Sequence, residues 1–425
     1  MSTVSRRQFL GTGAAFGAAA LLAGCGVGGN HKNSKSGPLK ALYMQQAGYP
    51  AQDINAMTTA FESANPGLKV QNTFVAYEAL HDKIVVSAPA GTYDVVHMDC
   101  IWPAEFVTKK MIIDVTRRIS PSTKNAILAG CWESVSYQDK LYGMPWGPST
   151  KLFFYNTSML QQAGVEPGSV TTWDDAIAAA KAIKSKGIVK YPFIWSWSQA
   201  EAIMCDFAQL LGSFGGQFLD ANGDPAFNTG GGLAALEWMK MTLDEGLTDP
   251  ASTKSLEDDV KKVLLQNRAA MALNWEYVYP ASKDKTQTPT PGAINVSVTP
   301  AGPGGKAVGC NGGMGLAITS GCSRPDDAWK LVSWMAGEKM TTKYAADNLP
   351  AYRAAYSNPS VTKGQAQLVA AEEKQQEALI NRPDVPNYNA ASQIIQAALQ
   401  DALLGHKSPK SALDGAADQV KRLTD

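Results

Sequence analysis

The sequence predicts an α/β protein with at least two domains, and three observations support this prediction. The chain has 425 residues, which is more than a single hydrophobic core ordinarily organises. Between residues 39 and 98, apolar strand-like stretches alternate with amphipathic helical ones, the order expected of a parallel, right-handed α/β unit. Two apolar, aromatic stretches within 141–156 are separated only by Gly147-Pro148-Ser149-Thr150, and such a break can carry a chain from one domain into another without a long linker.

The elements of the first α/β unit are predicted from hydrophobic periodicity and helix-stop signals. They are a strand at Leu39–Met44, a helix through Ile54, Met57 and Phe61 that ends at Asn65-Pro66-Gly67, an alternating strand over 68–74, a helix at Tyr77–Ser87 and a strand at Tyr93–Met98. Ligands bind beyond the carboxyl ends of the strands in such sheets. The loops that follow the strands, at 45–49, 77–78 and 99–102, are therefore expected to face a ligand.

The elements after residue 156 follow from caps and periodicity. Thr172 is expected to cap a helix, with Asp175 three positions later near the positive helix end. Tyr191–Trp197 is predicted to be a strand rich in aromatic residues. The remaining elements are a helix through Leu233–Leu243, a helical segment at Val260–Leu265, a strand leading into a loop at Ala270–Tyr279, strands at Ile294–Val298 and Gly309–Thr319, a helix opened by Ser323-Arg324-Pro325-Asp326, and helices at Gln393–Leu404 and Pro409–Leu423.

The N-terminus has the pattern of an export signal. Arg6 and Arg7 precede an apolar stretch at Gly11–Ala23, and the paired arginines indicate the twin-arginine route. Leu22-Ala23-Gly24-Cys25 resembles a lipoprotein cleavage box, so residues 1–24 are predicted to be a signal peptide, with Cys25 lipidated and 25–37 a flexible tether. The alternative is an uncleaved membrane anchor, for which the apolar stretch is short. The sequence thus predicts an extracytoplasmic protein anchored to the cell membrane as a lipoprotein.

Composition narrows the classes of partner and cofactor. The 38 basic and 38 acidic residues balance, which argues against a nucleic-acid partner because such a partner selects a basic surface. No C-x-x-C pair is present and the four histidines are scattered, so no metal site or cofactor is predicted. The cysteines after Cys25 are odd in number, and their pairing stays open; they are Cys100, Cys131, Cys205, Cys310 and Cys322.

Short motifs occur in a characteristic order along residues 38–425. They are L-Y-G-M-P-W (141–146), N-T-S-M-L-Q-Q-A-G-V (156–165), T-T-W-D-D-A (171–176), R-A-A-M-A-L-N-W (268–275), R-P-D-D-A-W-K-L-V-S-W-M (324–335) and P-A-Y-R (350–353). Together with the lipoprotein box, they resemble the extracellular solute-binding proteins of ABC importers, in the carbohydrate-binding, maltose-binding-protein-like branch. In that family the segment at 141–156 is the first crossing between two lobes.

The resemblance implies a two-lobe, periplasmic-binding-protein-like α/β fold with interleaved lobes and a hinge. Residues 38–147 and 300–337 are assigned to lobe I, and 148–299 and 338–425 to lobe II, with the second crossing near Thr299. It also implies that a small ligand, a carbohydrate, is captured in the cleft between the lobes and delivered to the permease subunits of an ABC transporter. No enzymatic activity is expected.

Aromatic and polar side chains at predicted loops and strand ends indicate a carbohydrate site. An aromatic ring buries the apolar face of a sugar, while carboxylates and guanidinium groups hydrogen-bond its hydroxyls. The resembling proteins place a stacking aromatic at the position of Trp275. The candidate ligand-binding residues are Tyr49, Glu78, Asp99, Trp102, Trp146, Trp195, Trp197, Trp275, Glu276, Tyr277, Gly313 and Arg353. The competing interpretation of each is ordinary packing or solvent exposure. Trp195 and Trp197 share one face of their predicted strand, so either both line the cleft or both pack.

Three other functions stay open. The first is a binding protein for a glycerophosphodiester or phosphorylated polyol, although no cluster of Arg, Lys and Ser is evident at the loops. The second is a surface glycoside hydrolase, which requires two carboxylates facing one cleft, and the sequence singles out no such pair. The third is a structural surface lipoprotein, which leaves the aromatic residues unexplained.

Overall fold

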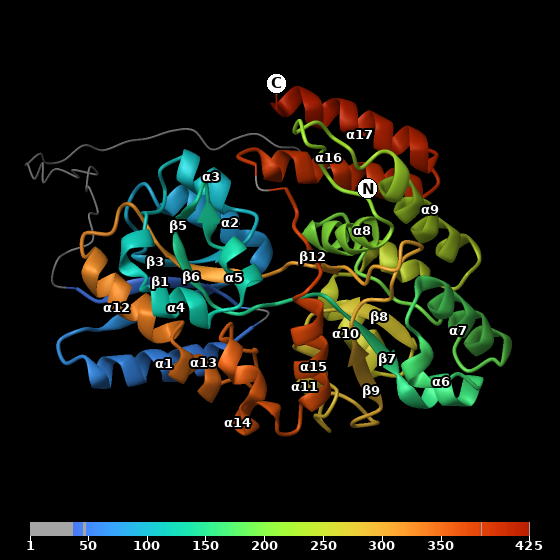
Figure 1. Ribbon diagram of the computed structural model, residues 1–425, viewed down its shortest axis with the longest axis horizontal. Coiled ribbons are helices and arrows are strands. Elements are labelled where there is room, and N and C mark those ends of the chain that lie inside the picture. The colour runs from blue at the N-terminus through green and yellow to red at the C-terminus, as the bar shows by residue number, and fades with distance from the viewer. Residues whose placement is uncertain (1–36, 46–47, 384, 425) are drawn as a thin grey trace, which may run out of the picture.

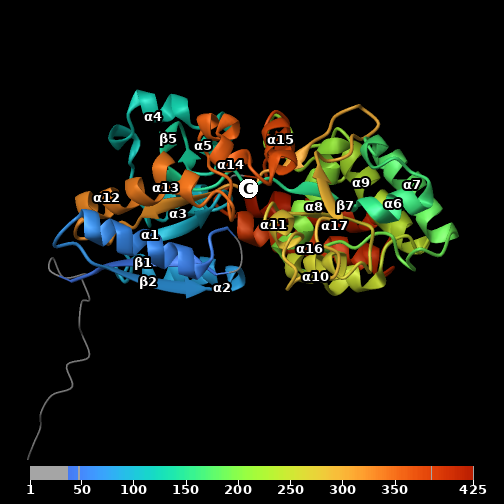
Figure 2. The same cartoon turned by 90° about the horizontal axis from the view of Figure 1, so that it is seen from below.

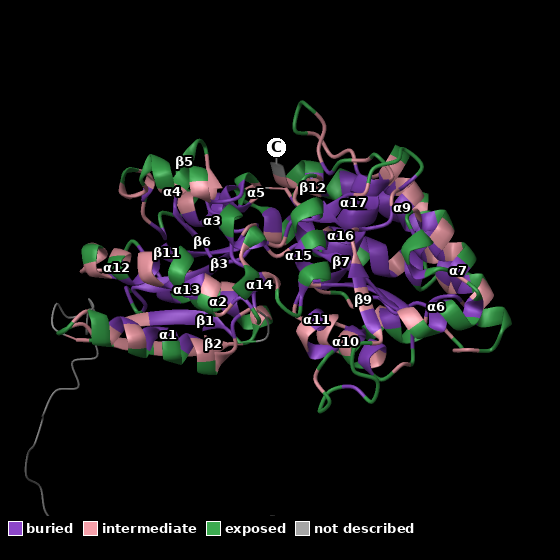
Figure 3. Ribbon diagram, turned by 60° about the horizontal axis from the view of Figure 1, so that its bottom comes forward, coloured by how far each residue is buried: buried purple, intermediate pink, exposed green. Residues whose placement is uncertain are grey.

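Two lobes lie side by side in the computed structural model, which describes residues 37–45, 48–383 and 385–424 (Figure 1). The predicted signal peptide, Cys25 and all of the tether except Gly37 lie outside the described residues. None of the helices in this part of the chain combines the length and the apolar character that a membrane span requires. In each lobe the buried residues are concentrated in the sheet and the inner faces of the helices (Figure 3).

The first lobe is built on a five-stranded sheet of order β2-β1-β3-β11-β6. Its strands are β1 (Leu39–Met44), β2 (Val70–Val75), β3 (Val95–Asp99), β6 (Gly143–Pro145) and β11 (Met314–Ile318). β1 runs parallel to β2 and β3, whereas β11 runs antiparallel to β3 and β6. The carboxyl ends of β1, β2 and β3 point toward the second lobe, which brings the loops after them to the interface between the lobes.

Helices cover both faces of the first sheet (Figures 1 and 2). α1 and α12 pack against each other on one face, and the Trp334 indole donates a hydrogen bond to the Met57 carbonyl, 3.2 Å away. The helical elements of this lobe are α1 (Ala51–Ala64), α2 (Tyr77–Ser87), α3 (Pro103–Thr108), η1 (Thr116–Arg118), α4 (Pro121–Ala126), α5 (Ala129–Glu133), α12 (Pro325–Met335), α13 (Glu338–Lys343), η4 (Arg353–Ser357) and α14 (Pro359–Thr362). A small hairpin joins β4 (Ser136–Tyr137) to β5 (Lys140–Leu141).

The second lobe has a three-stranded antiparallel sheet of order β8-β7-β9. Its strands are β7 (Leu152–Asn156), β8 (Met271–Asn274) and β9 (Ile294–Ser297). The helical elements are α6 (Thr157–Ala163), η2 (Pro167–Ser169), α7 (Trp173–Ser185), α8 (Glu201–Ser213), α9 (Gly230–Asp244), η3 (Pro250–Lys254), α10 (Glu257–Leu265), α11 (Val278–Ala281), α15 (Ala366–Gln375), α16 (Tyr388–Leu403) and α17 (Pro409–Thr424). α7 begins with the capping box that the sequence predicts, in which Thr172 and Asp175 satisfy each other's backbone N–H groups.

Three chain segments that cross between the lobes lie against one another and form the hinge. The first passes from β6 to β7 through Trp146–Lys151. The second contains β10 (Gly309–Cys310), and the third contains β12 (Leu379–Ile380), which pairs with β10 in parallel. A bridge between Thr150 and Asn311 connects the first crossing to the second. Because the crossings pair only over these short stretches, the lobes are joined by a narrow region in which bending is concentrated.

The lobe boundaries differ from the expected ones in two places. Ala301 still bridges Thr172 in the second lobe, so the second crossing comes after residue 301 rather than near Thr299. Beyond residue 338, α13, η4 and α14 remain in the first lobe, where Tyr352 bridges Ile127 and Met340 joins the core. The amphipathic pattern of these helices specifies a buried face, but it does not specify which lobe buries that face.

The predicted strand at Tyr191–Trp197 does not form a ladder; Phe193 makes isolated bridges to Thr248 and Met271 only. Its aromatic side chains are buried in the core of the second lobe, and an alternating sequence pattern does not distinguish such packing from strand pairing. The segment at Ala270–Tyr279 is a strand leading into a loop, as predicted, since β8 ends at Asn274; α11 then begins at Val278.

Candidate ligand-binding site

A cavity of about 460 Å³ lies between the lobes, next to the hinge. Both lobes contribute to its wall, since residues from the loops after β1, β2 and β3 face residues from α8, α10, α16 and the segment after β8. The wall combines aromatic rings with carboxylates and amides, which is the composition that suits a polyhydroxylated ring. The aromatic members are Tyr77, His81, His97, Trp102, Trp146, Trp275 and Tyr277.

The wall of the first lobe is built around Asp99 at the carboxyl end of β3. The Tyr77 hydroxyl donates to the Asp99 carboxylate over 2.8 Å, and the Tyr77 ring stacks on Trp102 with centroids 6.0 Å apart. His97, two residues earlier, accepts a 3.4 Å hydrogen bond from the Met44 backbone through Nδ1. Burial lowers the pKa of His97 to about 3, so its ring is neutral, and Nε2 carries the proton.

The wall of the second lobe is built around Trp275, directly after β8. The Trp275 backbone N–H donates to the Asn274 side chain over 2.9 Å, and its indole N–H donates to Glu257 over 3.4 Å. The Lys151 ammonium lies 5.3 Å from the centre of the Trp275 ring, a cation–π contact. These contacts hold the ring in one orientation against the cavity before any ligand is bound, and such preorganisation favours affinity.

Gly312, on the second crossing, leaves the space that the Trp275 ring occupies. A Cβ atom added at Gly312 would overlap Cη2 and Cζ3 of Trp275. We therefore expect Gly312→Ala to displace the ring and to weaken ligand binding by about tenfold, since overpacking typically costs about 1–3 kcal/mol. Binding calorimetry on the variant measures this loss. Gly304→Ala is the matched control, because a Cβ there meets no atom within 4 Å; equal affinity of the two variants would contradict the role given to Gly312.

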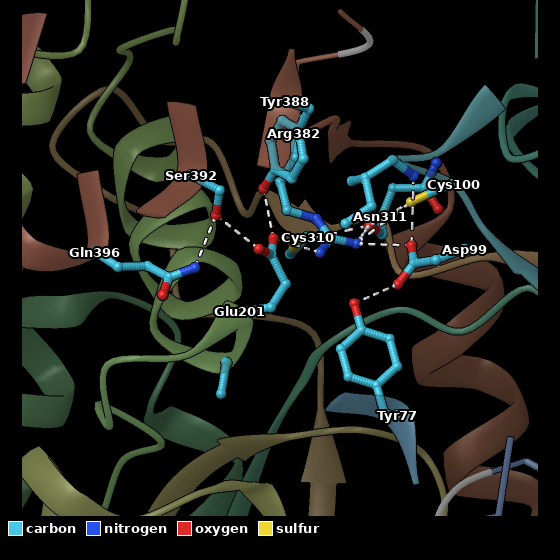
Figure 4. A network of polar contacts seen from close by, with 12 residues as sticks. Tyr77, Asp99, Cys100, Glu201, Cys310, Asn311, Arg382, Tyr388, Ser392 and Gln396 are labelled. Atoms are coloured by element: carbon cyan, nitrogen blue, oxygen red, sulfur yellow. Dashed lines mark hydrogen bonds and ion pairs between the residues drawn. The ribbon is translucent and has the colours of Figure 1, made fainter. Parts of the chain in front are cut away.

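Arg382, on the third crossing, connects the two lobes at the side of the cavity (Figure 4). Its side chain is 1% exposed and forms ion pairs with Asp99 of the first lobe at 3.2 Å and Glu201 of the second lobe at 2.8 Å. Glu201 also accepts hydrogen bonds from Tyr388 and, over 2.7 Å, from Ser392. The guanidinium is thus shared between two carboxylates that belong to different lobes.

Lys151, on the first crossing, is the centre of a second buried cluster. Its side chain is fully buried and contacts Asp206 at 2.6 Å and Glu257 at 3.5 Å. Burial raises the pKa of the Asp206 carboxyl, and the neighbouring ammonium opposes that shift. As with Arg382, one cation is shared between two carboxylates.

Two further carboxyl groups are buried at the hinge. Glu276 lines the cavity, is 3% exposed, and accepts a 2.8 Å hydrogen bond from Ser149. Glu372 of α15 accepts hydrogen bonds from Thr150 at 2.5 Å and Gln376 at 3.0 Å. Burial, followed by the charge of Glu276, raises the pKa of Glu372 to about 8, and burial also raises the pKa of Glu276.

The raised pKa of Glu372 predicts that stability falls as the pH rises. Between pH 4.5 and about 8 the native carboxyl keeps its proton while the unfolded one has lost it, so raising the pH favours the unfolded state. We expect Glu372→Gln, which cannot ionise, to gain at least about 1 kcal/mol relative to the unmodified protein across this window. Urea denaturation at both ends of the window measures the difference. Glu373→Gln, at an exposed position, serves as control. If the free energies of unfolding of Glu372→Gln and of the unmodified protein differed by the same amount at both pH values, the raised pKa of Glu372 would be contradicted.

The cavity brings together seven of the residues that the sequence singles out. They are Glu78, Asp99, Trp102, Trp146, Trp275, Glu276 and Tyr277. Trp146 presents only part of its ring, because it is 2% exposed and packs against Tyr43 and Tyr49.

The other five candidates lie elsewhere. Trp195 and Trp197 are both buried in the core of the second lobe, stacked with centroids 5.8 Å apart. Tyr49 lies behind Trp146, at 4.9 Å between ring centroids. Gly313 packs beside Ser134 and Pro148, while its neighbour Gly312 reaches the cavity. Arg353 is exposed at the start of η4 in the first lobe. Their positions depend on how segments pack, which strand-end assignments alone do not specify.

Sequence reasoning missed most of the polar residues on the wall. Tyr77 is in the loop at 77–78 that the sequence predicts to face a ligand, two residues after β2 ends, but it is not among the candidate ligand-binding residues. Glu201, Glu257 and Arg382 carry no local pattern that separates them from solvent-exposed charges. Asn348 and the residues of α16, which include Asn389, Ser392, Gln393 and Gln396, come from the end of the chain and reach the cavity only through the tertiary fold. Among the described residues, no group of three or more His, Cys, Asp or Glu side chains is placed to hold a metal ion.

Known proteins share this sequence pattern and fold. Residues 47–342 match the family model described as bacterial extracellular solute-binding protein. A probable ABC transporter-binding protein of Deinococcus radiodurans is 25% identical over 348 residues, covering 80% of this chain and 81% of the relative. Maltose-bound MalE3 from T. maritima superposes with a TM-score of 0.83 at 25% identity, covering 91% of this chain and 100% of that one.

A second solved structure is similar to this chain to nearly the same degree. An ABC transporter solute-binding protein from Thermotoga lettingae, bound to α-D-tagatose, has a TM-score of 0.82 and 25% identity over 91% of this chain and 100% of that chain. The predicted family and two-lobe fold are both confirmed. The chain therefore belongs to the bacterial extracellular solute-binding proteins, the extracytoplasmic substrate-binding components of ABC transporters, and has the maltose-binding-protein-like fold.

Proposed function

We propose that this protein captures a carbohydrate, an oligosaccharide or glycoside, in the cavity between its lobes and delivers it to the permease of an ABC importer. The observation that carries the proposal is the wall of the cavity, in which Trp102 and Trp275 from opposite lobes accompany carboxylates and amides. The rings supply apolar surface for the faces of a sugar, and the polar groups accept hydrogen bonds from its hydroxyls. Maltose and tagatose in the similar structures are consistent with this ligand class.

Ligand binding is coupled to closure of the lobes. A ligand that touches both walls stabilises the closed arrangement, whereas one with equal affinity for open and closed forms shifts nothing. The closed form is then the species that the permease recognises. No step in this cycle breaks a covalent bond of the ligand, so the protein acts as a carrier and not as an enzyme.

The charge of the wall favours this proposal over a phosphorylated ligand. Arg382 is the only Lys or Arg among the described residues that line the cavity, and both of its ends are occupied by carboxylates. A phosphate group entering the cavity has no unpaired cation to meet and lies near several carboxylates, which repel it.

A thermal-shift screen tests the ligand class. The purified protein is heated with a panel of sugars, glycosides, polyols and glycerophosphodiesters. A specific ligand at about one hundred times its dissociation constant adds roughly 2.7 kcal/mol, which raises the melting midpoint visibly. We expect a di- or oligosaccharide to shift the midpoint and to be recovered intact. Recovery of cleaved sugar, or a shift with phosphodiesters alone, would overturn the proposal.

The proposal includes a lipid anchor at Cys25. The support is the sequence Leu22-Ala23-Gly24-Cys25 after an apolar stretch. Acyl chains on this cysteine hold the protein at the membrane beside its permease. We expect Cys25→Ser to move the protein from the membrane fraction to the soluble fraction, as measured by immunoblotting of fractionated cells. A variant that stays in the membrane fraction after an alkaline wash would contradict lipidation.

A further inference from the structure

The wall of the cavity holds more negative than positive charge. Among the described residues that line it are seven carboxylates, one guanidinium and the His81 imidazole, which pairs with Asp82 at 3.0 Å; the carboxylates are Glu78, Asp82, Asp99, Glu201, Glu257, Asp258 and Glu276. Such a count alone does not define a site, because carboxylates on a wall are often neutralised by cations behind it. The pairing of each buried carboxylate therefore decides how much charge remains.

The buried cations do not neutralise the carboxylates around them. Arg382 is shared between Asp99 and Glu201, and Lys151 is shared between Asp206 and Glu257. Each of these two clusters contains one positive and two negative groups. Lys261 pairs with Asp258 at 2.7 Å and balances it. Each cluster therefore has one more negative than positive group, and both contain residues that line the same cavity.

Glu276 is a further buried carboxylate, and it forms no ion pair with any described residue. Its Oε1 accepts the Ser149 hydrogen bond, but its Oε2 is buried and has no hydrogen-bond partner among the described residues. The Oδ1 atom of Asn348, a residue that lines the same cavity and is 4% exposed, is likewise buried without a donor. The Asn348 amide is oriented by its Nδ2 group, which donates to the Trp146 carbonyl over 3.3 Å. Among the described residues on the wall, these two acceptors lack donors, as the Arg382 Nε donor lacks an acceptor.

A buried charge without a counter-charge is costly, and a protonated amine satisfies these groups best. An ammonium group offers three N–H donors and a positive charge, whereas a hydroxyl offers one donor and no charge. Burial raises the pKa of Glu276 and of Glu372, which agrees with a region where no described cation stabilises their charged forms.

We infer that the preferred ligand is a carbohydrate that carries a protonated amine, such as an amino sugar or an amine-bearing glycoside, with the ammonium group placed at Glu276 and Asn348. This inference rests on the proposed function, because it assumes that the cavity is a carbohydrate site. To the proposed function, the inference adds a positive charge on the ligand and the residues that recognise this charge.

Matched pairs of ligands test the inference. Binding of glucosamine and its β-1,4-linked disaccharide is compared with that of their N-acetylated counterparts and of glucose and cellobiose, by calorimetry on the purified protein at neutral pH. We expect the amines to bind at least about tenfold more tightly than the neutral sugars of the same size. A hydrogen bond to a charged group contributes at least this much affinity. Equal or tighter binding of the neutral sugars would overturn the inference and leave the proposed function intact. Failure of all six sugars to bind would count against both.

Glu276→Gln locates the recognition. This variant keeps the shape of the side chain and removes its charge, so we expect the ratio of amine affinity to neutral-sugar affinity to fall from about ten to about one. Glu373→Gln, on the exposed face of α15, is the matched control and is expected to retain the preference. Retention of the preference in Glu276→Gln would overturn the assignment of the ammonium group to Glu276. Circular dichroism verifies that both variants are folded.

Discussion

Replacement of Arg382 by methionine is expected to lower the free energy of unfolding by about 3–5 kcal/mol, the usual cost of removing one partner from a buried ion pair. The substitution leaves Asp99 and Glu201 buried without their shared cation. It also removes the tie between the lobes, since Asp99 ends β3 of the first lobe and Glu201 begins α8 of the second. Chemical denaturation followed by tryptophan fluorescence measures the change.

Two further variants distinguish the effect of the lost ion pairs from the effect of lost packing. Arg422→Met, at an exposed position of α17, is expected to change the free energy of unfolding by no more than about 0.5 kcal/mol. Adding Asp99→Asn and Glu201→Gln to Arg382→Met removes the unpaired charges, so part of the loss is expected to return. If Arg382→Met were as stable as the unmodified protein, the guanidinium would not hold the two lobes together.

Replacement of Trp275 by alanine is expected to weaken carbohydrate binding by at least about 2 kcal/mol, or roughly 30-fold. Trp275 is held by Asn274, Glu257 and Lys151, so its ring is already in place when the ligand arrives. Its removal takes away a stacking surface and opens the wall to water. Calorimetric titration with the ligand identified in the thermal-shift screen measures the loss.

Trp329→Ala is the matched control for Trp275→Ala. Trp329 lies on α12, packs against the core of the first lobe and does not line the cavity. We expect this variant to lose stability but to keep its affinity for the ligand. Wild-type affinity of Trp275→Ala, or an equal loss in both variants, would contradict a direct role for the Trp275 ring.

The sequence by itself determined the features that arise from neighbouring residues. Thr172 and Asp175 produce the capping box at the start of α7, and the alternation of strands and helices from residue 39 to 99 produces the parallel β2-β1-β3 unit. The rule that ligands lie beyond strand ends singled out Asp99 and Trp102, and the family resemblance singled out Trp275; all three line the cavity. These features depend on interactions between residues that are close in sequence, or on a general rule of sheet geometry.

Only the tertiary structure decided which charged and aromatic residues meet at the cavity. Trp195 and Trp275 are both aromatic residues near the second sheet, yet one is buried in the lobe core and the other reaches the cavity. Arg382 pairs with Asp99, which is 283 residues away in the chain. Such pairings depend on which lobe each crossing enters and on how the lobes close, and a local pattern of residues carries no information about partners that distant.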